Sequence, residues 1–326
     1  MSATLKDIYC PHPLPRRGLG FFLSYCDRLG RICYSVDNVV YQRGIDNPLD
    51  ADVYSEHSDK ISMATYSPTG LFIASADIEG KLRIWAPTNK EHTLKLEARP
   101  ISGPIYDMSW TGDNERLACI GKGQNSYGCV INAKTGASLG EVMGHTGTVQ
   151  SCALRAERPY RFVTGGDDNT SVFYKGPPFK FDHTAHDHDK FILCVRYAPD
   201  GSVYVTTGLD GKLIFYDGQT GEKKFEHQLP CGVACVSFSP DSKQLLCSLM
   251  DGKVVTLNVE DGQKTAEWNM GSEIYQQQMG ALWTKNAKLS VSLNGNFNYL
   301  QDDGTFRTEY GHTASVNSVS VIPGGF

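Results

Sequence analysis

The chain has 326 residues, of which 40% are hydrophobic and 21% are charged, with a formal net charge of −5. This composition is typical of a folded globular protein, and the mild negative charge argues against nucleic acid or an anionic membrane as a partner. No run of 18 apolar residues occurs, so we expect no transmembrane helix.

The cysteines and the N-terminal residues indicate the compartment. The first residues lack the apolar core of a signal peptide. The ten cysteines are scattered, mostly within strand-like apolar runs. We therefore expect them to be small buried hydrophobic residues in a reducing compartment, the cytoplasm.

The chain begins, over residues 1–16, with one expected strand (residues 4–10) and a proline-rich linker, PHPLPRRG. From residue 17 onward, short apolar runs with alternating polarity are separated by turns rich in Gly, Asp, Asn and Pro, a pattern typical of strands and hairpins. The runs form groups of four that recur every 40–45 residues or so, which predicts a propeller with one four-stranded blade per group.

Two consecutive groups in the middle of the chain share three markers: an initial histidine, an aspartate in the second hairpin and an aromatic residue ending the third strand. The markers are His145, Asp168 and Tyr174 in one group and His188, Asp210 and Tyr216 in the next. They recur with the period of a WD repeat. Each aspartate can bond to its own turn and to the histidine, which can bond a threonine on the second strand (Thr164, and Thr206 or Thr207). We interpret these histidines and aspartates as structural networks.

Counting repeats predicts an all-β fold, a seven-bladed WD-repeat β-propeller of four-stranded antiparallel blades over residues 17–310. Trp85 ends the third strand of the second blade, where Glu79-Gly80 replaces the Asp-Gly turn. The third blade lacks the histidine, and its second hairpin is GKGQNSYG (residues 121–128).

Residues 311–326 resemble the first strand of a further repeat, so this strand and residues 4–10 are left unpaired. Because an isolated strand edge is a liability, both strands should be paired. We expect them to belong to a second propeller of a longer protein; the alternative is an incomplete eighth blade.

Four segments are more specific than a WD repeat. Residues 55–70, 157–181, 188–202 and 276–284 closely resemble actin-interacting protein 1, and the likeness covers nearly the whole chain. It corresponds to that family's N-terminal propeller. The resemblance implies a cytoplasmic, cytoskeletal protein that binds filamentous actin decorated by actin-depolymerising factor/cofilin. It also implies that the protein promotes severing and disassembly of these filaments through protein contacts, without a cofactor.

The resemblance further implies an actin/cofilin-binding surface on the third to fifth blades. Its candidate residues are Asn125, Asp167, Phe179, Phe181 and Phe191. Exposed aromatic residues beside charge are typical of interface hot spots. The hairpin of residues 121–128 departs from the family, which carries a charged GEGRE-like sequence where this chain has GKGQN. Such a charge change alters partner choice.

Each candidate also has a structural interpretation. Phe179 and Phe181 could pack on the outer strands, Phe191 could belong to the core of a first strand, and Asp167 could only cap its hairpin. The histidine-rich residues 182–189 could bind a metal, but a solvated loop is the simpler interpretation, so we expect no metal site.

Two other functions compete with actin disassembly. A generic WD-repeat scaffold for a different protein complex is the alternative, favoured by the altered hairpin. An enzyme is disfavoured because the sequence offers no nucleophile–base pair, carboxylate pair or metal constellation outside the structural positions.

Overall fold

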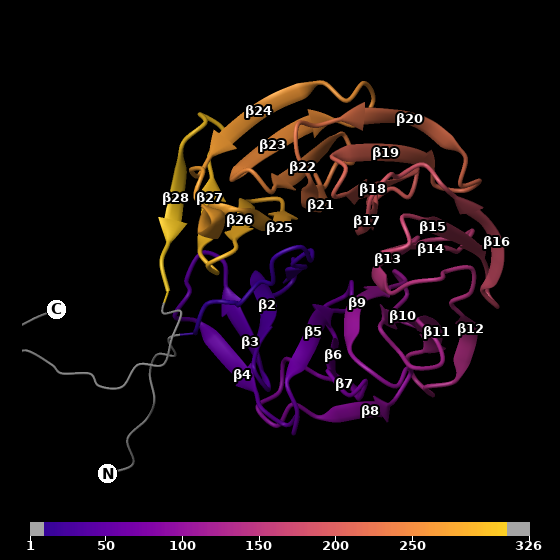
Figure 1. Ribbon diagram of the computed structural model, residues 1–326. Coiled ribbons are helices and arrows are strands. Elements are labelled where there is room, and N and C mark those ends of the chain that lie inside the picture. Colours follow the sequence, from indigo (N-terminus) through magenta and orange to yellow (C-terminus); the bar gives the residue numbers. More distant parts are fainter. Residues whose placement is uncertain (1–9, 312–326) are drawn as a thin grey trace, which may run out of the picture.

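The computed structural model describes residues 10–311 and contains seven four-stranded antiparallel sheets, arranged as the blades of a ring (Figure 1). In every sheet the four strands follow one another from the inside of the ring to the outside. The predicted seven-bladed propeller is therefore confirmed. The strand expected over residues 4–10 lies, except for Cys10, outside the described residues, and the one expected after residue 311 lies wholly outside them.

The strands of the first four blades have the following bounds. They are β1 (Ser24–Cys26), β2 (Arg31–Val36), β3 (Val39–Gly44) and β4 (Ala51–Tyr54); β5 (Ile61–Tyr66), β6 (Ile73–Asp77), β7 (Leu82–Trp85) and β8 (Leu94–Ala98); β9 (Ile105–Trp110), β10 (Arg116–Gly121), β11 (Gly128–Asn132) and β12 (Ser138–Glu141); and β13 (Val149–Leu154), β14 (Arg161–Gly166), β15 (Ser171–Lys175) and β16 (Lys180–Ala185).

Blades 5 to 7 are built in the same way, with one short 3-10 turn, η1 (Ile274–Gln276), between the last two. Their strands are β17 (Ile192–Tyr197), β18 (Val203–Gly208), β19 (Lys212–Asp217) and β20 (Lys223–Gln228); β21 (Val233–Phe238), β22 (Gln244–Leu249), β23 (Lys253–Asn258) and β24 (Lys264–Asn269); and β25 (Gln278–Trp283), β26 (Lys288–Ser292), β27 (Phe297–Leu300) and β28 (Phe306–Glu309).

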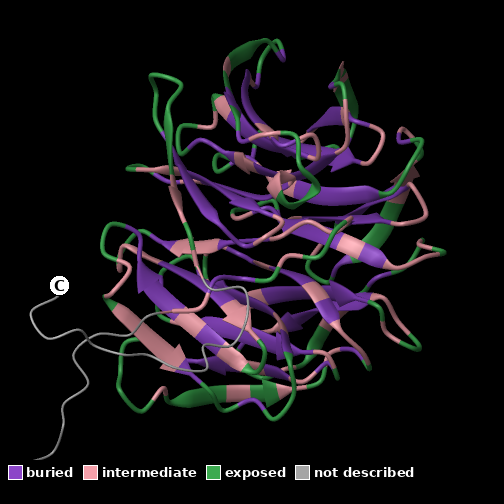
Figure 2. Ribbon diagram, turned by 60° about the vertical axis from the view of Figure 1, so that its left-hand side comes forward, coloured by how far each residue is buried: buried purple, intermediate pink, exposed green. Residues whose placement is uncertain are grey.

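Burial follows the position of a strand within its blade. The second and third strands are almost wholly buried, because both of their faces pack against neighbouring blades, whereas fourth strands such as β8 and β20 alternate between exposed and partly buried residues (Figure 2). All ten cysteines are free, and eight of them are buried. The cysteines therefore serve as small hydrophobic residues, as the sequence predicts.

The ring closes between β3 of blade 1 and β28 of blade 7 through side chains. Arg43 is only 2% exposed, forms an ion pair with Glu309 and lies 4.4 Å from the ring centre of Phe297. The hydroxyl of Tyr299 donates to the carbonyl of Ile45 at 3.3 Å. Within residues 10–311, the first and last blades share no sheet. Their junction therefore depends on these contacts and on the surrounding apolar core.

The proline-rich segment, expected to be a linker, packs on the ring. The Tyr34 hydroxyl donates to the carbonyl of Pro11 at 2.9 Å, and His12 is buried, with its Nε2 3.4 Å from the Glu309 carboxylate. Further along, the backbone of Phe21 pairs with Gly280 of blade 7, and its N–H donates to the carbonyl of Met279 at 2.8 Å. This segment therefore joins the two ends of the ring.

Candidate functional site

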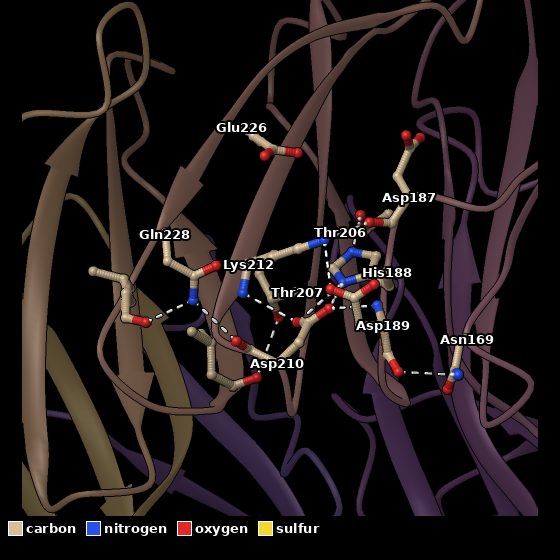
Figure 3. A network of polar contacts seen from close by, with 12 residues as sticks. Asn169, Asp187, His188, Asp189, Thr206, Thr207, Asp210, Lys212, Glu226 and Gln228 are labelled. Atoms are coloured by element: carbon tan, nitrogen blue, oxygen red, sulfur yellow. Dashed lines mark hydrogen bonds and ion pairs between the residues drawn. The ribbon is translucent and has the colours of Figure 1, made fainter.

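The marker residues of blade 5 form a chain of hydrogen bonds (Figure 3). His188 Nδ1 lies 2.9 Å from Asp210 Oδ2, and His188 Nε2 lies 2.8 Å from the Thr206 hydroxyl. The Asp210 carboxylate also accepts the N–H groups of Asp189 and Lys212, each at 3.0 Å. Of the two threonines that the sequence leaves open, Thr206 is the partner of the histidine.

Blade 4 repeats this arrangement. His145 Nδ1 lies 3.0 Å from Asp168 Oδ2, and His145 Nε2 lies 2.7 Å from the Thr164 hydroxyl. The carboxylate accepts the N–H of Thr146 at 2.8 Å and the hydroxyl of Thr170 at 2.8 Å. In both blades, one carboxylate thus joins the hairpin turn to the loop that enters the blade.

A third network in blade 2 contains a residue that sequence reasoning missed. His57 Nε2 lies 2.8 Å from the Ser75 hydroxyl, which also accepts the indole N–H of Trp85 at 3.1 Å. The carboxylate comes from Asp77, 3.4 Å from His57 Nδ1, and not from the Glu79 turn. The spacing from aspartate to aromatic residue in the other repeats would place the carboxylate of the network at Glu79. The sequence signal that could have indicated Asp77 is an acidic residue at the end of an apolar strand.

The environment of the aspartates explains their state. Burial alone would raise the pKa of Asp210, but hydrogen bonds from His188 and from backbone N–H groups lower that pKa to about 2. The pKa of Asp168 is likewise held below its usual value, because its bonds to His145 and Thr146 outweigh burial. Both carboxylates are fixed anions near neutral pH, which suits a structural role and not proton transfer.

The histidine-rich stretch of residues 182–189 contains histidines with different partners. Within the described part of the chain, no group of three or more His, Cys, Asp or Glu side chains is placed to hold a metal ion. His183 pairs with Asp182 at 2.9 Å, while His188 is engaged in the blade 5 network. His183 and His188 thus bind different partners instead of facing a common site.

The candidate interface residues in hairpins and loops lie at one end of the ring. In successive blades, a residue of the second hairpin donates its N–H to the carbonyl just before the inner strand: Lys122 to Pro104, Asp167 to Thr148 and Leu209 to Phe191, at 2.9–3.1 Å. These positions are equivalent, so the loops carrying Asn125, Asp167 and Phe191 face the same way. Asn169 also donates to the carbonyl of Asp189 at 3.3 Å, which joins the loops of blades 4 and 5.

Two of the three candidate aromatic residues are exposed. Phe181 and Phe191 are each 48% exposed. The Phe181 ring lies beside Gly144, where an added Cβ would come within 2.8 Å of it, so Phe181 borders the same loop from the outer side. Asn125 is exposed and Asp167 is partly buried. Asn125, Asp167, Phe181 and Phe191 are thus distributed over blades 3 to 5.

Phe179 does not belong to this surface, and its assignment to the interface is wrong. Its side chain is only 4% exposed and lies edge-on to Phe162, with ring centres 6.1 Å apart. Its N–H donates to the carbonyl of Leu139 in blade 3 at 2.7 Å. Phe179 is therefore a core residue between blades 3 and 4.

The structure adds Met143, which the sequence did not single out. Its side chain is 64% exposed, and its carbonyl accepts the Tyr174 hydroxyl at 2.6 Å. It directly precedes Gly144, the residue beside which the Phe181 ring lies. An apolar residue in a polar loop, EVMGHT, was the available signal.

The hairpin of residues 121–128 is well anchored although its tip is exposed. Gln124 donates its N–H to the carbonyl of Ser102 at 3.2 Å, and the Tyr127 hydroxyl reaches the carbonyl of Thr146 at 3.5 Å. Lys122 and Asn125 are exposed. A positive charge and a neutral amide therefore stand on the blade 3 side of the surface, opposite Asp167.

Nowhere in residues 10–311 is there a helix long and apolar enough to cross a membrane.

Comparison with known proteins agrees with the geometry. The family model described as "WD domain, G-beta repeat" matches residues 51–86, 179–217 and 222–255. The chain is 39% identical over its full length to WD repeat-containing protein 1 of Gallus gallus, and 42% identical over 98% of its length to WD repeat-containing protein 1-B of Xenopus laevis. It is also 42% identical, over 90% of its length, to Actin-interacting protein 1 of Drosophila melanogaster.

These relatives are longer than the chain. The aligned part covers 54% of the Gallus gallus protein, 54% of the Xenopus laevis protein and 49% of the Drosophila melanogaster protein. The chain thus spans about half the length of the relatives it matches.

Proposed function

Because the chain belongs to the WD-repeat family of actin-interacting protein 1 and WD repeat-containing protein 1, we propose that it binds filamentous actin decorated by actin-depolymerising factor/cofilin and promotes filament disassembly. The name of the Drosophila melanogaster relative supports actin as a partner. Cofilin dependence and severing go beyond that name and belong to this proposal, as does a place in the cytoplasmic cytoskeleton.

The observation that carries the proposal is the pair of exposed rings beside the Asp167 hairpin. Phe181 and Phe191 each leave about half of their side chain in solvent, although both lie next to well-packed blades. Large aromatic side chains release much free energy when an interface buries them, and they dominate binding hot spots. Asp167 adds a charge that fixes the register of a partner.

The proposed mechanism makes and breaks no covalent bond. A rigid propeller that binds the filament can shift the equilibrium between intact and disassembling filament only if it binds one of these two states more tightly than the other. Disassembly therefore requires that this surface bind cofilin-decorated filament ends or strained junctions more tightly than intact filament.

Co-sedimentation tests the proposal. The chain is pelleted with filamentous actin, with and without cofilin, and the actin left in the supernatant is measured. We expect pelleting and additional soluble actin only when cofilin is present. Removal of a hot-spot residue, by Phe181→Ala, Phe191→Ala or Asp167→Ala, should weaken pelleting by about tenfold.

Phe306→Ala is the matched control, because Phe306 is also an exposed phenylalanine but lies on the outer strand of blade 7. It should leave pelleting unchanged. Equal pelleting with and without cofilin, or equal losses from Phe306→Ala and Phe181→Ala, would contradict the proposal.

The altered hairpin favours a second candidate, a WD-repeat scaffold for a different protein complex. Lys122 places a positive charge at the edge of the surface, and a change of local charge selects against some partners. A scaffold of this kind predicts no cofilin-dependent pelleting at all, so the same experiment separates the two candidates.

A further inference from the structure

A pocket of about 400 Å³ opens at the inner edge of blades 1 to 4. One wall is the N-terminal segment of residues 14–21, and the other walls are the starts of the inner strands β5, β9 and β13. Figure 1 shows these three strands side by side along the inside of the ring. The volume falls within the range of sites that hold a small ligand or a peptide side chain.

The pocket lies at the same end of the ring as Asp167. Ile78, on its wall, donates its N–H to the carbonyl of Lys60 at 2.9 Å, just as Asp167 does to Thr148 in blade 4. The pocket nevertheless shares no residue with the surface formed by Asn125, Asp167, Phe181 and Phe191. The two regions are thus neighbouring but lined by different residues.

The lining of the pocket combines polar side chains with apolar ones that are incompletely covered. Leu19, Phe21, Val36, Ile78 and Tyr106 all line it and all remain partly exposed. Partly exposed apolar side chains around one hollow gain free energy when another apolar group fills it. An apolar side chain of a partner would therefore fit against these five residues of the pocket.

The rim adds a positive charge. Lys60 is paired with Asp37 at 3.3 Å, so these two charges offset one another. Arg16 lines the same rim and is exposed, and no carboxylate of residues 10–311 lies within ion-pair distance of it. Guanidinium groups bind carboxylates with paired, charge-assisted hydrogen bonds.

We propose that this pocket binds an extended segment of a partner protein in which a large apolar side chain stands next to a carboxylate. The apolar side chain enters the hollow between Phe21 and Tyr106, and the carboxylate pairs with Arg16 at the rim. The pocket and the proposed actin surface share no residue, so substitutions can address each of them separately.

Matched peptides test this specificity on the whole chain. The probes are acetyl-Gly-Phe-Asp-Gly-amide, the same peptide with Asn in place of Asp, and the same peptide with Ala in place of Phe. Amide chemical shifts in nuclear magnetic resonance spectra give both affinity and location. The Phe-Asp peptide should shift the amides of Leu19, Gly20 and Gln150 with the tightest dissociation constant, and each altered peptide should bind at least about fivefold more weakly.

Two variants with a matched control complete the test. Arg16→Gln should abolish the preference for Asp over Asn, whereas Arg17→Gln, an exposed neighbour that does not line the pocket, should retain it. Ile78→Trp, which fills the hollow, should remove binding of all three peptides while the melting temperature confirms folding.

Three outcomes would overturn the proposal: equal affinity for the Asp and Asn peptides, shifts confined to other parts of the ring, or no binding of any of the peptides. Absence of binding together with self-association that Ile78→Trp abolishes would mean that a second copy of the chain covers the pocket. Loss of cofilin-dependent actin pelleting would not affect any of these readouts, so the two proposals fail separately.

Discussion

At the scale of single residues, one carboxylate in each of blades 4 and 5 connects the second hairpin to the loop that enters the blade. Asp168 and Asp210 each bind a buried histidine and two backbone N–H groups at once, so their charge is shared among donors from two loops. A buried carboxylate that loses such donors would be left with the full cost of desolvation.

We expect Asp210→Asn to lower the free energy of unfolding by about 1–3 kcal/mol at neutral pH, because it removes charge-assisted bonds to His188 and to the turn. Asp251→Asn is the matched control. Asp251 holds the same hairpin position in blade 6 and caps Lys253 N–H at 3.1 Å, but blade 6 has no marker histidine. Chemical denaturation measures both, and equal effects would contradict the network's importance.

The same pair gives a pH dependence. The pKa of Asp210 is about 2 in the folded chain and near 4 in an unfolded one. Its contribution to stability is therefore complete above about pH 4 and is lost as the pH falls towards 2. Asp210→Asn should make the decline in stability between pH 4 and pH 2 shallower; an unchanged slope would assign that decline to other groups.

Phe179 and Phe181 provide a second contrast between neighbouring residues. Phe179→Ala should lower the free energy of unfolding by about 3–5 kcal/mol, because it opens a cavity between blades 3 and 4. Phe181→Ala should cost less than about 1 kcal/mol, because half of that ring is already in solvent. Thermal and chemical denaturation give both values, and similar losses would place Phe181 in the core.

At the scale of elements, the recurrence of markers predicted the blades, but the pairing within several hairpins is irregular. The pairing of β15 with β16 shifts between Phe173 and Tyr174, so Phe173 faces His183 while Tyr174 faces Phe181. Phe179 lies in the turn before β16, which begins at Lys180, so strand alternation alone could not assign Phe179 and Phe181 to opposite environments. In blade 2, the carboxylate that faces the histidine comes from Asp77 at the end of β6, although the sequence pattern places the acidic residue in the turn, at Glu79.

Other features of the elements were readable from sequence because they depend on local chemistry. The histidine–aspartate networks of blades 4 and 5 follow from the spacing of markers within one repeat. Phe191 stood at the boundary of an inner strand, where the sequence allowed either core or surface. A register shift between Ile192 and Cys194 begins just after it, and the ring remains outside the buried run.

The hairpin of residues 121–128 allows a charge test of the proposed interface. If the acidic residues of related hairpins face a basic partner, Lys122→Glu should strengthen cofilin-dependent pelleting by about two- to fivefold at low salt. The gain should shrink as salt is raised, because exposed charges are screened. Lys134→Glu, an exposed lysine beyond β11 that lies outside the hairpin, is the control. Equal changes in both variants would indicate a general charge effect.

At the scale of the whole molecule, the ring depends on a junction that no strand crosses within residues 10–311. Other neighbouring blades are also covalently consecutive, whereas β3 and β28 meet only because the chain returns to its start. At this junction the pKa of Glu309 is lowered to about 2: burial would raise it, but hydrogen bonds from His12 and Arg43 outweigh burial. The pair is therefore ionised near neutral pH, inside an apolar cluster.

Glu309 is the counter-charge of Arg43 at this junction, so its loss should destabilise the ring. Glu309→Gln leaves the buried Arg43 guanidinium without its counter-charge, which costs about 3–5 kcal/mol when a buried pair is broken. Asp50→Asn is the control, because its pair with Arg31 lies at the surface, and such pairs contribute at most about 1 kcal/mol. Chemical denaturation compares the two. If Glu309→Gln were no more destabilising than Asp50→Asn, the apolar contacts of Tyr34, Phe297 and Tyr299 would suffice to close the ring, and the ion pair would serve only to align the two blades.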